Sequence, residues 1–107
     1  MKKQSIELKG FKSPSALEIK KMAEISRAVK HPFRTKLLNL MHQHKQITVT
    51  ELHTIMNEVQ PIVSQHLAIL RKVKAVHTNR KGKEIFYSVN YKFFIKYINI
   101  YTEFHKE

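Results

Sequence analysis

Hydrophobic residues recur every three or four positions in four successive segments of the chain, and this spacing predicts four helices. A proline opens three of the segments, where it suits the first turn of a helix. Two segments also begin with a capping-box pattern, Ser15 with Glu18 and Thr48 with Glu51. Asn57 tolerates a left-handed backbone, so it predicts a tight turn between the third and fourth helices. The predicted helices cover residues 13–30, 32–44, 48–56 and 60–73.

The hydrophobic pattern changes from helical to extended after residue 74. Val76–Asn79 and Glu84–Val89 are rich in strand-forming residues, and Arg80–Lys83 between them includes a glycine, which predicts a hairpin. We expect Ile47 to be a brief extended position before the third helix. Residues 91–105 are aromatic and β-branched, but so long a run without a turn residue favours a helix. The predicted fold class is mostly α with a small β-hairpin: a winged helix-turn-helix of about five helices and a two-stranded wing.

Length and composition fit a single domain over residues 1–107, since 107 residues with 42% hydrophobic content can bury one core. The formal net charge of +12 favours a nucleic acid or an anionic membrane as the partner. No apolar run approaches the ~20 residues that span a bilayer, and no apolar segment of signal-peptide length follows the N-terminal lysines. We therefore expect a cytoplasmic protein that does not enter a membrane.

Residue types that support catalysis are poorly represented. The chain has no cysteine, which excludes disulfides, thiolate metal sites and thiol redox switches. Its eight acidic residues are all glutamates and are scattered, whereas acid–base catalysis usually needs paired titratable groups in a cleft. Two glycines cannot build a phosphate-binding loop. We expect no enzymatic activity and no cofactor.

The predicted helix at 60–73 has two unlike faces. Val63, Leu67 and Leu70 form a hydrophobic stripe. The opposite face is uncharged near the helix start, small in the middle and basic at the end, which suits contacts with base edges and then phosphates. Between residues 59 and 83 the chain holds six lysines and arginines and no acidic residue, so the helix end and the hairpin form one anion-binding strip. The alternative is an ordinary solvated helix face beside a solvated hairpin. The residues opposite the stripe are Pro61, Ser64, Gln65, Ala68 and Lys72.

Three stretches of the chain resemble the ArsR/SmtB family of bacterial transcriptional repressors, across about residues 25–90. Residues 28–38, AVKHPFRTKLL, are similar to the family's opening A-x-x-H-P-x-R…I-L, and residues 47–52, ITVTEL, to its L-T-V-S-E-L. Residues 60–71, QPIVSQHLAILR, resemble Q-P-T-V-S-R-H-L…L-R, and the RKGK…FYS of residues 80–88 resembles its wing. The third stretch, joined to its wing at this spacing, is the most specific of the three.

The resemblance implies a dimeric winged helix that binds an operator and releases it on a signal. By matching position, it implies that Gln60, Ser64 and Gln65 read bases, and that Thr48 lies near a phosphate. The wing would reach DNA through its basic residues. The predicted DNA-binding residues are Thr48, Gln60, Pro61, Ile62, Ser64, Gln65, Ala68, Arg71, Lys72, Arg80, Lys81 and Lys83.

The chain departs from the family pattern at three positions. Asn57 in the turn and Lys74 after the fourth helix both stand where a glycine is usual. Ile62 stands where a threonine is common, so its contact would be an apolar one to a thymine methyl group. These departures affect details of the turn and of base reading rather than the overall assignment.

The seven histidines do not form a metal-binding pattern. Many members of the resembled family bind metal, either through a cysteine, which this chain lacks, or by pairing D-x-H with a later H-x-x-E. Here Asn90-Tyr91-Lys92 stands at the first position, and a late His105 followed by Glu107 is too little for a tetrahedral site. We expect no metal site. His66 is interpreted as a hydrogen-bonded structural histidine and His31 as a helix-start residue.

The last predicted helix is apolar on two faces, and such a helix must be covered on more than one side. The core of so short a chain can cover one of them. We therefore expect the helices at 13–30 and 91–107 to form a homodimer interface. The alternative is that the last helix lies deep, with the first helix wrapped over it. The predicted interface residues are Met22, Ile25, Phe94, Tyr97, Ile98, Tyr101 and Phe104.

Together these features predict a homodimeric repressor that binds an inverted-repeat operator in double-stranded DNA through the helix at 60–73 and the basic wing at 80–83. Two alternatives stay open. One is a sequence-independent nucleic-acid binder driven by charge, and the other is a winged helix that docks on another protein. The operator sequence, repression as against activation, and any effector ligand or protein that releases the DNA are not determined by the sequence.

Overall fold

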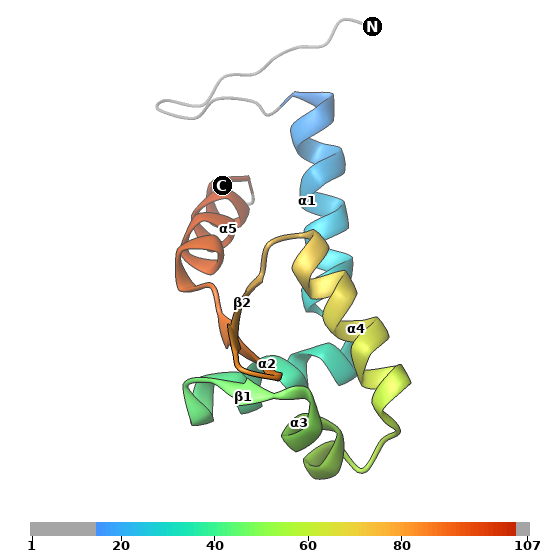
Figure 1. Cartoon of the computed structure of the whole chain (residues 1–107). Helices are drawn as coiled ribbons and strands as arrows, with labels where there is room; N and C mark the ends of the chain where they lie inside the picture. Colours follow the sequence, from blue (N-terminus) through green and yellow to red (C-terminus); the bar gives the residue numbers. More distant parts are fainter. Residues whose placement is uncertain (1–14, 105–107) are drawn as a thin grey trace, which may run out of the picture.

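The computed structural model describes residues 15–104, with the side chains of residues 100–104 excepted (Figure 1). Within this range the winged helix-turn-helix fold predicted from the sequence is confirmed. Residues 13, 14 and 105–107 of the predicted terminal helices lie outside the described residues. The elements are α1 (Ala16–Val29), α2 (Pro32–His44), β1 (Ile47–Thr48), α3 (Val49–Met56), α4 (Gln60–Lys72), β2 (Val76–Lys81), β3 (Glu84–Val89) and α5 (Tyr91–Phe104).

The helix starts follow from short side chains that satisfy free backbone N–H groups. Before α1, the backbone N–H of Glu18 donates to Ser15 Oγ at 3.1 Å, and that of Ser15 donates to Glu18 Oε1 at 2.9 Å. Thr48 and Glu51 form the same reciprocal pair before α3. Both predicted capping boxes are confirmed.

The sheet has three antiparallel strands in the order β1-β3-β2. The predicted hairpin is present, and β2 runs two residues further than predicted, so that Lys81 pairs with Glu84. Gly82 has a φ of 64°, and a positive φ at the first residue of a two-residue turn fits a type II′ hairpin. The extended position expected at Ile47 is the start of β1, which pairs with Tyr87 of β3 and adds a third strand to the sheet.

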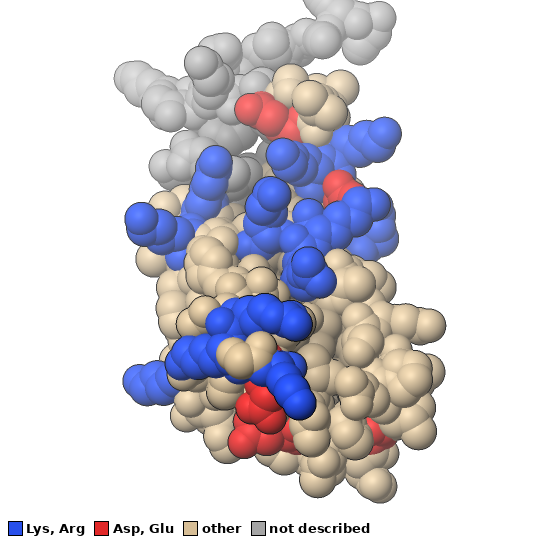
Figure 2. Space-filling model, viewed as in Figure 1, with Lys and Arg blue, Asp and Glu red and all other residues tan. Residues whose placement is uncertain are grey.

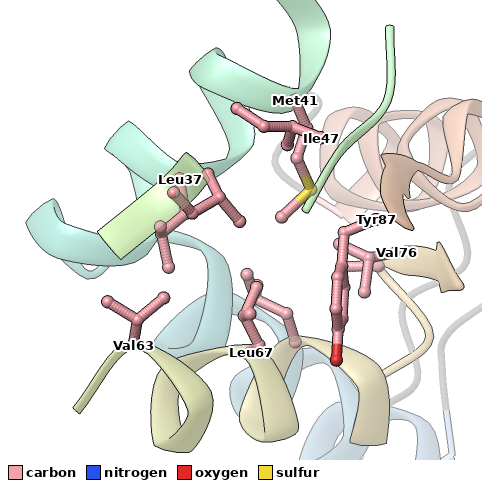
Figure 3. Packing of buried hydrophobic residues seen from close by; sticks show 10 residues of the cluster. Leu37, Met41, Ile47, Val63, Leu67, Val76 and Tyr87 are labelled. Carbon is pink, nitrogen blue, oxygen red and sulfur yellow. The ribbon is translucent and has the colours of Figure 1, made fainter. Parts of the chain in front are cut away.

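The hydrophobic core lies between α2, α3, α4 and the sheet. In Figure 3, Leu37 and Met41 of α2 lie opposite Val63 and Leu67 of α4, while Tyr87 closes the side nearest the sheet. Its members come from every element except α1 and α5, whose residues pack against it from outside. The buried cluster is Leu37, Met41, Ile47, Leu52, Val63, Leu67, Leu70, Ala75, Val76 and Tyr87.

The terminal helices α1 and α5 lie at the same end of the molecule (Figure 1). Ser26 Oγ and Tyr97 Oη are 2.8 Å apart, which links the two helices. His42 Nδ1 and Tyr91 Oη, 2.7 Å apart, link α5 to α2. Among the described residues, no helix combines the length and apolar character needed to cross a membrane.

Candidate nucleic-acid interface

The turn between α3 and α4 depends on one left-handed residue. Asn57 has φ 56° and ψ 47°, as predicted from its position. The N–H of Glu58 then reaches back to the carbonyl of His53 at 3.0 Å, and the N–H of Asn57 to that of Thr54 at 3.2 Å. These bonds satisfy carbonyls at the end of α3 and reverse the chain within three residues. The turn therefore sets the direction of α4 relative to α3.

The inner face of α4 holds the helix in place. Val63, Leu67 and Leu70 are at most 1% exposed and belong to the core, as the hydrophobic stripe predicted. At ~0.8 kcal/mol per buried CH₂, three such side chains hold the helix firmly against α2 and α3. The outer face is therefore presented on a fixed support.

The outer face of α4 is exposed along its whole length. Near the helix start this face is uncharged, and the positive charges come in its last turn. Ile62 is 36% exposed, so an apolar side chain also lies at the surface here. The predicted DNA-binding residues of α4 that the structure places in solvent are Gln60, Pro61, Ile62, Ser64, Gln65, Ala68, Arg71 and Lys72.

Thr48 differs from the other predicted contacts because it is buried. Its side chain accepts from the N–H of Glu51 at 3.1 Å and also lies 3.2 Å from Glu51 Oε1. Its exposed fraction is 6%. The capping role accounts for the hydrogen bonds of Thr48, and its nearness to a phosphate stays a prediction.

The wing places three positive charges at the tip of the β2–β3 hairpin. Arg80, Lys81 and Lys83 are all exposed. Lys81 Nζ lies 5.0 Å from the centre of the Phe86 ring, which restrains this side chain through a cation–π contact. Figure 2 shows one group of lysines and arginines over the β2–β3 hairpin and a second group where α1 passes the C-terminal end of α4. The surface over α3 and the start of α4 is largely uncharged.

Arg34 and His66 connect α1, α2 and α4 beneath the interface. Arg34 is 8% exposed. Its Nε donates to the carbonyl of Ala28 at 2.7 Å, and its Nη2 lies 3.3 Å from the carbonyl of Arg27. Its Nη1 is 3.2 Å from His66 Nδ1, and because arginine can only donate, that imidazole nitrogen accepts. The prediction that His66 is a hydrogen-bonded structural histidine is confirmed.

The surroundings of His66 disfavour its protonated form. Burial is the main cause that lowers the pKa of His66, and the positive charge of Arg34 lowers it further, with His31 adding to the effect and Glu58 opposing it. The imidazole stacks on the Phe33 ring at a centroid distance of 4.5 Å and lies 5.0 Å from the His31 ring. His31 itself accepts from the N–H of Phe33 at 3.1 Å, so its predicted helix-start role is confirmed. The neutral His66 that this site favours keeps Nδ1 free to accept from Arg34.

Sequence reasoning missed two positioning residues. Arg34 was noted only as part of the motif at residues 28–38. Its burial and its contacts with α1 and α4 were not predicted. Asn90 donates from Nδ2 to the carbonyl of Lys74 at 2.9 Å and accepts on Oδ1 from the N–H of Phe93 at 3.2 Å. It therefore joins the end of α4 to the start of α5. The available signal was an asparagine directly before a helical run, a typical N-cap pattern.

Two of the predicted dimer residues already make contacts within the single chain: Phe94 packs against the core, and Tyr97 Oη lies 2.8 Å from Ser26 Oγ of α1. Met22 and Ile25 of α1 and Phe94 and Tyr97 of α5 are half-buried within the single chain, and Ile98 is 55% exposed. The side chains of Tyr101 and Phe104 lie outside the described residues. Exposed apolar residues along α5, including Tyr91 and Ile95, show that this helix is not deeply covered by α1. Over residues 91–99, whose side chains the structure describes, the alternative of a deep last helix is therefore wrong.

Metal ligands are not grouped in the part of the chain that the structure describes. No three histidine or glutamate side chains between residues 15 and 99 lie close enough together to hold a metal ion. His105 and Glu107, which entered the sequence argument, lie outside that range.

Comparison with known proteins places the chain in a family. A family model described as "Bacterial regulatory protein, arsR family" matches residues 31–76. The chain is 41% identical over 68 residues to the transcriptional repressor PagR of Bacillus anthracis, which covers 64% of this chain and 68% of PagR. It is 32% identical over 69 residues to the transcriptional repressor SdpR of Bacillus subtilis (strain 168), which covers 64% of this chain and 76% of SdpR.

A solved structure supports the same assignment. The crystal structure of PagR superposes with a TM-score of 0.64 at 33% identity, over 80% of this chain and 99% of that one. The matched family segment, residues 31–76, contains the whole helix-turn-helix and the Arg34–His66 pair. The resemblance stated from the sequence motifs is confirmed: the chain belongs to the arsR family of bacterial regulatory proteins.

Proposed function

We propose that this protein is a DNA-binding transcriptional regulator, a homodimeric repressor that binds an inverted-repeat operator. The observation that carries the proposal is the outer face of α4, which is exposed, uncharged at its start and flanked by cations at its end and on the wing. PagR and SdpR, to which the chain is similar, are both named transcriptional repressors. A helix presented in this way suits the major groove, where base edges carry distinct hydrogen-bond patterns.

In this proposal, uncharged residues contact the bases and positively charged residues contact the phosphates. Gln60, Ser64 and Gln65 form hydrogen bonds with base edges, and Ala68 lets the helix approach closely. The exposed Ile62 contacts a thymine methyl group. The cationic residues Arg71, Lys72, Arg80, Lys81 and Lys83 contact phosphates, which supplies most of the affinity and fixes the register.

The proposed dimer is formed by α1 and α5. Ile95 and Ile98 are 60% and 55% exposed in the single chain, and Leu17 of α1 is 73% exposed, so these helices carry apolar surface that a second copy can bury. A two-fold dimer would present its two α4 helices to major grooves about one turn, ~34 Å, apart. The inverted repeat in the operator follows from that symmetry.

Selection from random DNA tests the reading function. The protein is incubated with a pool of random duplexes at near-physiological salt, and the retained DNA is sequenced. We expect enrichment of an inverted repeat with half-sites one turn apart, since α4 reads bases. Gln65→Ala should change the enriched half-site, whereas Gln43→Ala, an exposed glutamine on α2, should leave it unchanged. A flat pool would contradict the proposal and favour charge-driven binding without base reading.

Substitutions in the wing distinguish DNA binding from docking on another protein. Replacing Arg80, Lys81 and Lys83 together with glutamine should weaken operator binding and make the slope of log K against log salt concentration shallower by roughly 2–3. Lys20, Lys21 and Lys36, all exposed and away from the hairpin, provide a control with the same loss of charge. Equal effects from both triple variants would show that overall charge, and not the wing, supports binding.

A further inference from the structure

A pocket of about 220 Å³ lies between α1, α2 and α4, beside the proposed interface but separate from the face that reads bases. Arg27 and Glu24 of α1 and Lys72 of α4 lie at its exposed edge. The inner side is formed by the buried residues Arg34 and Ala28. Ile69 and Val73 of α4 complete the lining with apolar surface.

The charge inside this pocket is not neutralised by the groups that contact it. The hydrogen-bond partners of Arg34 among residues 15–104 are two backbone carbonyls and one imidazole, all neutral acceptors. These bonds use three of the five N–H donors of the guanidinium. A buried cation without a carboxylate partner is costly and strongly attracts an anion. The side chains of Arg27 and Lys72 also form no ion pair within the described residues, so three cations face one glutamate here.

The size and lining specify the kind of anion. The pocket is open to solvent on one side, and its volume exceeds the ~150 Å³ of a cavity that binds benzene, so a six-membered ring with one added polar group is small enough to enter it. Guanidinium groups pair with carboxylates through parallel N–H···O bonds. We propose that the pocket binds a small organic carboxylate whose apolar body lies against Ile69 and Val73 and whose carboxylate meets Arg34 and Arg27.

Ligand binding here would affect the interface through α4. Ile69, Lys72 and Val73 belong to that helix, and Lys72 is one of the residues assigned to a phosphate. A carboxylate that takes up the charge of Lys72 would weaken its contact with DNA and so act as a releasing signal. This consequence rests on the proposed function, whereas binding of the carboxylate does not.

Nuclear magnetic resonance on the full-length chain, without DNA, tests the binding itself. Benzoate and the uncharged benzamide are titrated in turn into ¹⁵N-labelled protein at constant ionic strength. We expect benzoate to bind with a Kd in the millimolar range or tighter and to shift the amide signals of Ala28 and Val73 and the Nε–H signal of Arg34. Benzamide should bind more weakly, because it lacks the charge that Arg34 and Arg27 recognise.

Two variants identify the pocket as the site. Arg27→Gln should weaken benzoate binding about tenfold, and Ile69→Glu should abolish it by placing a negative charge at the edge. Lys21→Gln removes the same charge from an exposed position of α1 outside the pocket and should have no effect. The proposal is overturned if benzoate shifts signals across the whole basic surface, if benzamide binds equally well, or if Arg27→Gln and Lys21→Gln behave alike. Because the titration contains no DNA, the absence of benzoate binding would not contradict the proposed DNA-binding function. Conversely, a duplex selection without enrichment would not contradict benzoate binding.

Discussion

The central helices and the terminal helices of this protein differ in the exposure of their hydrophobic residues. Leu37 and Leu67 in the centre are at most 1% exposed, whereas Leu17 of α1 is 73% exposed and Ile98 of α5 is 55% exposed. The central part therefore completes its own core within one chain. The terminal helices keep apolar surface that the single chain does not cover, which is the surface assigned to the proposed dimer. The difference separates the surface that folds the single chain from the surface assigned to the proposed dimer.

The largest effect on stability should come from truncating a leucine in the central region. The same substitution in a terminal helix serves as the comparison. Leu67→Ala empties a filled position between α4 and α2 and should lower the free energy of unfolding by about 2–5 kcal/mol. Leu17→Ala removes an exposed side chain and should change it by no more than about 0.5 kcal/mol. Urea denaturation at a protein concentration low enough to favour monomers measures both.

Equal losses from the two leucine substitutions would contradict the comparison. They would mean that α1 contributes to the core of the monomer as strongly as α4 does. Repeating the measurement at high protein concentration sharpens the test, because a stability contribution that passes through the dimer depends on concentration.

Ile98→Glu should weaken self-association next most strongly. A carboxylate placed in an apolar interface must be desolvated without a partner, and we expect the dimer dissociation constant to rise about 30-fold or more, equivalent to roughly 2 kcal/mol. Analytical ultracentrifugation measures the constant. Ile85→Glu makes the identical change at a 37% exposed position of β3, opposite Arg80 in the β2–β3 hairpin and outside the proposed interface, and should leave association unchanged.

If both glutamate variants dimerise as the wild type does, the terminal helices are not the interface. If the wild type is monomeric at all concentrations tested, the exposed apolar surface of α5 has another partner. Either result would leave the central winged helix-turn-helix as described.

The features that could be predicted from the sequence are those determined locally. Capping boxes at Ser15 and Thr48 require residues three apart, and the left-handed turn at Asn57 depends on one residue type. The hydrophobic stripe of α4 gave its buried and exposed faces correctly, because helical geometry alone relates them. The positions of Pro61, Ser64 and Gln65 on the surface followed directly.

The features that could not be predicted depend on distances across the fold. Arg34 looks like an ordinary surface cation in the sequence, and its burial follows from the approach of α1 and α4 to α2. The pairing of Ile47 with Tyr87 joins residues 40 positions apart, which no local pattern specifies. The pocket beside Arg34 likewise exists only where three helices meet.

The contact between α2 and α4 through His66 predicts a pH dependence of stability in the central region. Burial and Arg34 lower the pKa of His66 in the folded protein, so the unfolded chain binds a proton more readily. The free energy of unfolding should therefore fall as the pH drops below ~6.5, the usual histidine value, and this loss should level off below the folded pKa. Urea denaturation between pH 7.5 and pH 5 measures it.

Substituting His66 isolates that contribution. His66→Gln keeps an acceptor for Arg34 but cannot be protonated, so the loss of stability at low pH should become smaller than in the wild type. His77→Gln, at an exposed position of β2, provides the matched control and should leave the pH dependence unchanged. The same pH dependence in the wild type and in His66→Gln would show that other groups, and not the α2–α4 contact, cause it.

The smallest expected effect concerns Lys74, which the central region holds in a left-handed conformation. Its φ is 72°, and its carbonyl accepts from Asn90 Nδ2, so the backbone is fixed there by the link between α4 and α5. A residue with a side chain is strained in that conformation by about 1–2 kcal/mol, while glycine loses roughly 0.4–1 kcal/mol through the greater freedom of its unfolded chain. Lys74→Gly should therefore raise the free energy of unfolding by a few tenths to about 1 kcal/mol. Asn57→Gly, at another position of this region with positive φ, should gain less, because asparagine adopts this conformation readily. A loss of stability in Lys74→Gly would mean that the lysine side chain stabilises the end of α4 by more than the backbone strain costs. Relieving the backbone strain at this position would then not stabilise the central region.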